Sequence, residues 1–267
     1  MSAETQTPAP GITFTKQDGE AALAVLASLG NPEYGLPTLT DEEIVALDGI
    51  NHPQAVALPW LDTHRSQLEL VCNVALRTLL SKGLVFPVSV NSETAPSRLG
   101  AIEPITGVMA LRRLSQRVVI AELTKSGDEK VWLYTYCHDE TALQELVDSS
   151  GTHAFSVCRV SDAGRVIMEL ANAAGISSAD GPAEVLTAEQ FEAKATREFD
   201  DVRGVTIITA IGAGQGEADH YTLYTSSDAL HGLEATEENG EARLQVVQVS
   251  SDTALAKVGA VVSGAGA

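Results

Sequence analysis

Residues 118–123 read VVIAEL and residues 205–210 read VTIITA, and the relationship between these two apolar, β-branched runs decides the fold. Each run is followed, after a polar or glycine-containing connection, by an alternating run that is typical of a second strand. These second runs are KVWLYTYC at 130–137 and HYTLYT at 220–225. The sequence therefore predicts two β-hairpins, one in each part of the chain.

The similarity between the two parts extends past the hairpins. FSVCRVSDAGRVIMELANAAG at 155–175 matches LQVVQVSSDTALAKVGAVVSG at 244–264, so Asp162 and Asp252 each open a helix after a strand. ITFTKQDGEAALAVLASLG at 12–30 repeats this strand–Asp–helix element once more. Each unit reads helix, hairpin, intervening segment, third strand and helix. Because a repeat is a property of the whole architecture, we expect two like-built segments that join their strands in one sheet about an approximate dyad.

The clearest helix of the sequence lies at 62–82. Apolar side chains recur there at the spacing of one helical face, and Gly83 follows as a terminator. The residues that share this face are Leu68, Val71, Cys72, Ala75, Leu76 and Leu79.

Two other helices are predicted from a capping box, in which a Thr is followed three residues later by Glu or Gln. These boxes are Thr40 with Glu43 and Thr187 with Gln190. Further helices are expected after Asp18 as a capping residue and ending at Gly30, in GVMALRRLSQ at 107–116, and in HDETALQELVDSSG at 138–151.

Gly212, Gly214 and Gly216 follow the strand at 205 and raise the question of a phosphate-binding loop. A dinucleotide fingerprint has the spacing G-x-G-x-x-G and leads into a helix. Here the third glycine comes too early, and the next segment has the pattern of a strand. The first copy of the repeat has the polar turn TKSGDE at this place. We therefore interpret Gly212–Gly216 as a long hairpin connection.

Composition limits the classes of function. The 267 residues carry 36 Asp and Glu against 17 Lys and Arg, a formal charge of −19 that would repel nucleic acid and anionic lipid. The opening MSAETQTPAPG has neither a basic nor an apolar signal region, and no run reaches the length of a membrane span, so we expect a cytoplasmic protein without membrane insertion. The three cysteines, Cys72, Cys137 and Cys158, lie in apolar runs and are expected to be buried thiols.

The sequence predicts no catalytic residue, no metal site and no cofactor. The acidic pairs at 42–43 and 200–201 are interpreted as solvated helix ends, and the six histidines stand in no metal-binding motif. Cys137-His138-Asp139-Glu140 is the one dense cluster of reactive residue types, at a predicted turn. An enzyme that uses the Cys137-His138 turn is therefore kept as an alternative.

A regulatory, winged-helix-like protein is a second alternative. The helix at 62–82 and the extended LVFPVSV at 84–90 imitate a recognition helix and wing. Charge opposes this interpretation, because the segment carries only Arg65, Arg77 and Lys82 as cations.

The layout of the chain resembles the EspG family of actinobacterial type VII (ESX) secretion-associated proteins. The resemblance rests on the N-terminal strand and helix ending in Leu-Gly, the long helix closing on LLSKGLV, GVMALRRLSQ running into VVIAEL, and the second half that repeats the first. It spans roughly residues 11–263.

This resemblance implies an α+β fold with a central, mainly antiparallel sheet flanked by helical bundles and two pseudo-twofold-related halves. It implies a single EspG-like domain over 11–263, with halves of about 11–150 and 151–263. Residues 1–10 are expected to form a disordered tail, because they hold two prolines and show no periodicity. The resemblance also implies a cytosolic chaperone without enzymatic activity that binds helical secreted substrates, such as PE-PPE-type heterodimers, and keeps them soluble. The resemblance places no partner-binding residue and no oligomeric state on this sequence.

Overall fold

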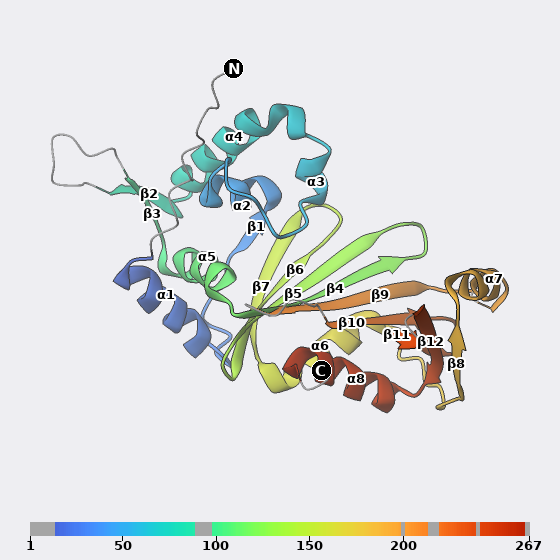
Figure 1. The fold of residues 1–267 in the computed structure, drawn as a ribbon. Helices are drawn as coiled ribbons and strands as arrows, with labels where there is room; N and C mark the ends of the chain where they lie inside the picture. Colours follow the sequence, from blue (N-terminus) through green and yellow to red (C-terminus); the bar gives the residue numbers. More distant parts are fainter. Residues whose placement is uncertain (1–13, 89–97, 199–200, 213–218, 239–240, 265–267) are drawn as a thin grey trace, which may run out of the picture.

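The computed structural model describes residues 14–88, 98–198, 201–212, 219–238 and 241–264 (Figure 1). Its helices are α1 (Lys16–Ala27), α2 (Asp41–Asp48), α3 (Pro59–Asp62), the 3₁₀ turn Arg65–Gln67, α4 (Leu68–Ser81), α5 (Glu103–Leu114), α6 (Val160–Ala171), α7 (Ala188–Glu198) and α8 (Ser251–Ser263). Its strands are β1 (Thr38–Thr40), β2 (Val85–Val88), β3 (Arg98–Ala101), β4 (Arg117–Lys125), β5 (Lys130–His138), β6 (Thr141–Val147), β7 (Thr152–Arg159), β8 (Ala183–Leu186), β9 (Gly204–Gly212), β10 (Asp219–Thr225), β11 (Leu230–Glu238) and β12 (Glu241–Val249).

One large antiparallel sheet forms the centre of the molecule. Its strand order is β1-β7-β6-β5-β4-β9-β10-β11-β12-β8, and β2 and β3 form a separate two-stranded sheet. The two predicted hairpins, β4–β5 and β9–β10, are present and meet where β4 pairs with β9. The predicted α+β class, with a central antiparallel sheet and flanking helices, is therefore confirmed.

The order of strands is the same when it is followed outward from the β4–β9 pair in either direction. Ala121 of β4 lies opposite Ile208 of β9, the residue that occupies its place in the repeat. Counting outward through the pairings, the fifth strand on each side is β1 and β8, and Leu39 falls in the same place as Leu186. The sheet is therefore built about a pseudo-twofold axis at its centre.

The two outermost strands share a sequence that the hairpin comparison does not include. Leu39 and Thr40 lead into α2, and Leu186 and Thr187 lead into α7, so LTDEE at 39–43 corresponds to LTAEQ at 186–190. Both predicted capping boxes are present. The Thr40 N–H donates to the Glu43 carboxylate at 3.2 Å, and the Thr187 N–H donates to Gln190 Oε1 at 2.9 Å.

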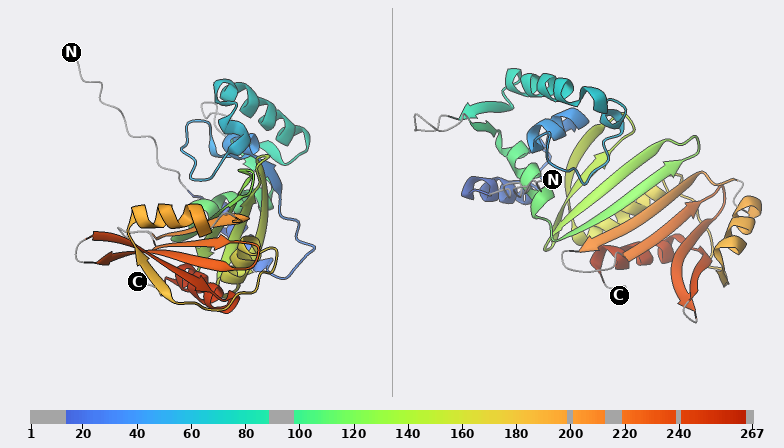
Figure 2. Two further views of the ribbon diagram at one scale, coloured as in Figure 1. Left: turned by 90° about the vertical axis from the view of Figure 1, so that its right-hand side faces the viewer. Right: turned by 45° about the horizontal axis from the view of Figure 1, so that its top comes forward.

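Each face of the sheet carries its own apolar core. On one face, α6 and α8 pack over the central strands, and Ala121, Ile208 and Leu223 are completely buried there. On the other face, α1 to α5 form an N-terminal helical layer over β5, β6 and β7 (Figures 1 and 2). The core of that layer includes Leu143 and Val147 of β6.

The two halves differ most in the segment between the helix with the capping box, α2 or α7, and the first long strand, β4 or β9. In the first half, residues 49–116 separate α2 from β4 and form α3, α4, β2, β3 and α5. In the second half, only residues 199–203 separate α7 from β9. The N-terminal helical layer, which covers one face of the sheet in the first half, therefore has no counterpart of similar size in the described second half.

The helix predicted at 138–151 is wrong, because these residues form β6 and the turns at its two ends. Ala, Leu, Gln and Glu favour a helix locally, but pairing with β5 and β7 overrides that preference. Asp139, at φ 52°, makes the tight turn that starts β6. In the second copy the intervening segment, for which no helix or strand is predicted, contains β11, so each half has four consecutive strands in place of three.

Other boundaries differ by a few residues. The helix predicted from Asp62 begins at Leu68 after the 3₁₀ turn, and it ends before Gly83, whose φ of +69° is left-handed. Thr15, and not Asp18, is the N-cap of α1, with Asp18 at the third helical position of a capping box. The predicted tail at 1–10 and most of the glycine-containing connection, at 213–218, lie outside the described residues.

Candidate partner-binding surface

The sheet face that carries the N-terminal layer is left open over its central strands. Between α3 and α7, no described helix lies over β4 and β9 on this side (Figure 1). The side chains that point to this face include Val118 and Ile120 of β4, which are partly exposed, and Ile207 and Ile211 of β9, which are 45% and 51% exposed. We call the surface made by these four side chains and by His220 and Thr222 of β10 the open sheet face.

Polar side chains lie among the apolar ones on the open sheet face. Thr209 stands between Ile207 and Ile211 and opposite Ile120, with its Oγ1 3.1 Å from His220 Nδ1. Glu122, opposite Ile207, pairs with Lys130 at 2.6 Å. Exposed apolar side chains that gather on one face mark interaction sites more often than singly scattered ones do. The arrangement fits a binding surface for an apolar partner.

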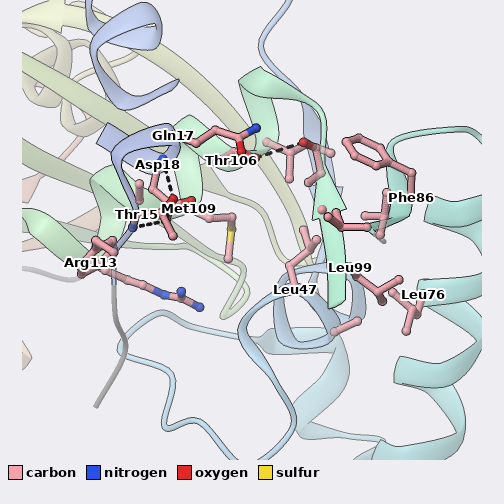
Figure 3. Close-up of a pocket in the computed structure, with 18 residues that line it drawn as sticks. Thr15, Gln17, Asp18, Leu47, Leu76, Phe86, Leu99, Thr106, Met109 and Arg113 are labelled. Carbon is pink, nitrogen blue, oxygen red and sulfur yellow. Dashed lines mark hydrogen bonds between the residues drawn. The ribbon is translucent and has the colours of Figure 1, made fainter. Parts of the chain in front are cut away.

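A second candidate surface lies in the N-terminal layer. It is a groove of about 780 Å³ between α1, α4, α5 and the β2–β3 sheet, lined by residues that include Leu47, Leu76, Phe86, Leu99 and Met109 (Figure 3). Several polar lining side chains are engaged with neighbours: Asp18 accepts the Thr15 N–H, Thr106 donates to the Ala101 carbonyl, and Arg113 pairs with Asp48. The groove presents polar and apolar surface in about equal parts.

A buried ionic cluster fixes the N-terminal layer to the sheet. His153 of β7 is fully buried, with Nδ1 2.7 Å from Glu145 Oε1 and Nε2 2.8 Å from Asp41 Oδ1. The other Asp41 oxygen accepts the N–H groups of Trp60 and Leu61, both at 2.9 Å. A single carboxylate thus joins α2, α3 and β7.

The cluster continues through Arg112 of α5. Its Nε donates to Glu145 Oε2 at 2.9 Å, its Nη1 donates to Asp48 at 3.1 Å, and the Tyr136 hydroxyl donates to the same Glu145 oxygen at 2.7 Å. Burial by itself would raise the pKa of Glu145, but the Arg112 charge and the hydrogen bond from His153 hold it below its usual value. Glu145 is therefore an ionised acceptor.

Burial opposes a charge on His153, but hydrogen bonds to Asp41 and Glu145, and the charges of both, raise its pKa above the usual value. Both ring nitrogens face carboxylate oxygens, and only an imidazolium can donate to both. Gly151, at φ +80°, leaves the space for this arrangement, because a Cβ there would lie 2.7 Å from Asp41 Oδ2. The cluster is a structural clamp, enclosed by protein.

The Cys137-His138 turn does not assemble a reactive site. Burial raises the pKa of Cys137 and lowers that of His138, and His138 Nε2 lies 3.1 Å from the Leu111 carbonyl. Burial also raises the pKa of Cys158, to about 11, and that of Cys72. All three cysteines are free thiols that favour the protonated, weakly nucleophilic form.

The acidic pairs are only partly the solvated helix ends that the sequence indicates. Glu43 is mostly buried, and its neighbour Asp41 is fully buried in the ionic cluster, so the start of α2 is an internal anchor. Asp201 is exposed and accepts from the Ser227 backbone at 3.2 Å. Among the residues that the structure describes, no group of three His, Cys, Asp or Glu is arranged to hold a metal ion.

The segment that imitates a winged helix carries little free positive charge. α4 is followed by the β2–β3 sheet, as the alternative expects. Arg65, however, pairs with Asp62 at 2.7 Å, and Lys82 lies 3.8 Å from Glu43. The described part of this segment therefore lacks the basic stripe that binding to nucleic acid needs. Across the described ranges of the chain, no helix has both the length and the apolar character to cross a membrane.

Comparison with known proteins places the fold. No protein-family model matches the sequence, and no curated protein matches it. The solved structure of the Mycobacterium tuberculosis type VII secretion system chaperone EspG5 in complex with the PE25-PPE41 dimer matches with a TM-score of 0.56 and 10% identity. The match covers 84% of this chain and 95% of that chain. The fold is EspG-like, as the sequence resemblance implies.

The buried clamp is a feature that sequence reasoning misses. Asp41 lies in an acidic run, Glu145 in a segment predicted to be a helix, and His153 at the start of an ordinary strand. A signal lies in the comparison of LTDEE with LTAEQ, which differ at Glu43 and Gln190 and, with loss of the polar side chain, at Asp41 and Ala188. A charged residue replaced by alanine at the first helical position of a repeat indicates that one copy has an additional role for that side chain.

Proposed function

We propose that this protein is a cytosolic chaperone associated with type VII secretion that binds helical secreted substrates and keeps them soluble before export. The observation that carries the proposal is the open sheet face, which exposes isoleucines next to polar side chains on a fold shared with a chaperone. The structural neighbour is bound to a PE25-PPE41 dimer, which supports a PE-PPE-like heterodimer as the partner. An ESX locus in an actinobacterium is part of the same proposal.

The geometry of the open sheet face supports a helical partner. Ile207 and Ile211 are four residues apart on one strand, so both point to the same face, and Val118 and Ile120 stand beside them across the β4–β9 pair. A partner helix with an apolar stripe can bury these four side chains together. Burial of apolar surface contributes about 25 cal/mol per Å² before the costs of association are subtracted.

We also propose that residues 11–263 act as one EspG-like domain. The long strands of both halves belong to one sheet, and Ala121 and Ile208 are buried at the junction of the halves. Counted by strand runs, β4 to β7 and β9 to β12 are the equivalent sets, so we place the division between halves after α6 and not at residue 150.

Co-expression tests the proposal. The chain is expressed with PE-PPE-type and other small helical proteins encoded in its gene neighbourhood, and the lysate is passed over an affinity tag on the chain. We expect a soluble, stoichiometric complex. The double variant Ile207→Glu with Ile211→Glu should lose it, because two buried charges would stand unpaired in the interface.

The matched control is Leu23→Glu. Leu23 lies on α1, is 68% exposed and is distant in the fold from β9, so this charge should leave the complex intact. Equal effects of the two variants on binding, whether loss in both or retention in both, would overturn the open sheet face as the binding site. Failure of every neighbouring protein to co-purify with the unmodified chain would overturn the proposed function.

A further inference from the structure

α2 and α7 occupy equivalent places in the two halves but are attached to the sheet differently. β1 leads into α2 and β8 leads into α7, and both helices begin at a Thr capping box. The register of the sheet makes Leu244 the counterpart of His153 and Leu233 the counterpart of Glu145.

The ionic clamp of the first half is therefore absent from the corresponding described positions of the second. Asp41, Glu145 and His153 are fully buried. Their counterparts are Ala188, Leu233 and Leu244, of which Ala188 is exposed and the two leucines are only partly buried. The three charged groups have thus been replaced by side chains that cannot form directed bonds.

Contacts along the two helices differ in the same direction. Ile44 of α2 is completely buried in the N-terminal core, whereas its counterpart Phe191 is partly buried and rests against Tyr224 with ring centroids 6.2 Å apart. Lys194 of α7 pairs with Glu184 at 2.6 Å, which ties α7 to β8. The contacts described for α7 are therefore more exposed to solvent than those described for α2.

Both ends of α7 are nevertheless held. β8 pairs with β12 over four residues, and the Arg203 N–H donates to the Thr225 carbonyl at 2.8 Å. A helix of 11 residues is marginal in water by itself, so its persistence depends on its contacts with the sheet. A helix that is fixed at its ends and less deeply buried between them can leave the sheet without release of the chain.

We propose that α7 is a displaceable cover at the margin of the open sheet face, whereas α2 is permanently fixed. When α7 lifts, Tyr224 and its neighbours on the same face, Leu233 and Leu244, join the apolar surface available to a partner. The part of this proposal in which α7 regulates partner binding rests on the proposed function. The motion itself is a property of the free protein.

Hydrogen exchange of the free, full-length protein, followed by mass spectrometry, tests the cover. We expect amides of α7 to exchange at least ~10-fold faster than those of α2, through local opening that does not follow global unfolding in low urea. Phe191→Ala should accelerate exchange in α7 further, through opening that stays independent of low urea. Ile44→Val, the change at the counterpart, should lower the urea midpoint and accelerate α2 exchange only in step with global unfolding.

Equal protection of α7 and α2 would overturn the cover, as would exchange of α7 that accelerates with urea in step with global unfolding. Because no partner is present in this experiment, its failure leaves the proposed function untouched. Failure of co-purification would in turn remove the proposed function and leave the exchange result standing.

Discussion

Ala121 and Ile208 lie directly opposite each other in the middle of the sheet, and each occupies the place of the other in the repeat. Both are completely buried beneath α6 and α8. The junction between the halves is thus part of a continuous core and not a linker. The two halves consequently share one sheet and one set of apolar contacts. Their strands pair directly where the halves meet.

Replacement of Gly107 by alanine should destabilise the protein. Gly107 of α5 lets α1 approach closely, because a Cβ there would lie 2.5 Å from both the Ala21 carbonyl oxygen and Val25 Cγ2. Backbone cannot yield as a flexible side chain does, so we expect a loss of about 1–3 kcal/mol in the free energy of unfolding. Chemical denaturation measures this change.

Gly19→Ala is the control for this experiment. Gly19 lies in α1, and a Cβ at this position would meet no neighbouring atom within 4 Å, so alanine should stabilise the helix by about 0.5–1 kcal/mol. A Gly107→Ala protein as stable as the wild type would show that α1 and α5 are farther apart than this contact requires.

Replacement of His153 by leucine should be strongly destabilising. It leaves Asp41 and Glu145 buried without the cation between them, and breaking one member of a buried ionic cluster costs about 3–5 kcal/mol. His52→Leu, in an exposed loop, should change the free energy of unfolding by less than about 0.5 kcal/mol. Similar urea midpoints for the two variants would refute a clamping role for His153.

The stability of the protein should depend on the protonation of His153. Because its folded-state pKa is raised, its contribution is fully present below the unfolded pKa of about 6.5 and is lost as pH rises through the folded value. His138, whose pKa is lowered by burial, gives the opposite slope. The difference in stability between wild type and His153→Leu isolates the first effect and should shrink as pH rises. A difference that grows as pH rises toward about 6.5 would show a neutral His153, and a constant difference would show that folding does not shift its pKa.

Thiol labelling distinguishes unreactive cysteines from a catalytic one; Cys72 is buried, and Cys137 and Cys158 are partly exposed. Burial raises the pKa of Cys137, and that of Cys158 to about 11, so the native protein should react with a disulfide reagent at about pH 7.5 more than about tenfold slower than the unfolded chain. Denaturant should release all three thiols. Rapid labelling of native Cys137 would instead support the alternative of an enzyme at the Cys137-His138 turn.

Several elements could be predicted from sequence because their causes are local. The face of α4 follows from periodicity, the starts of α2 and α7 from their capping boxes, and the β4–β5 hairpin from two alternating runs and a turn. β6 could not be predicted in this way, since its residues favour a helix and become a strand only through pairing on both sides. The surface residues Ile207 and Ile211 also carry no local signal, because an exposed isoleucine in a strand has the same pattern as a buried one.

The internal repeat, the two hairpins and the acidic, apolar-cored character of the chain follow from the order of its residues, since these features depend on neighbours along the backbone. Three others emerge only in three dimensions: the meeting of Asp41, Glu145 and His153, the equivalence of Leu39 and Leu186, and a sheet face that is covered over one half and open over the other. These features join residues that lie far apart in the chain. Their free energy comes from burial and ion pairing that exist only after the sheet has assembled.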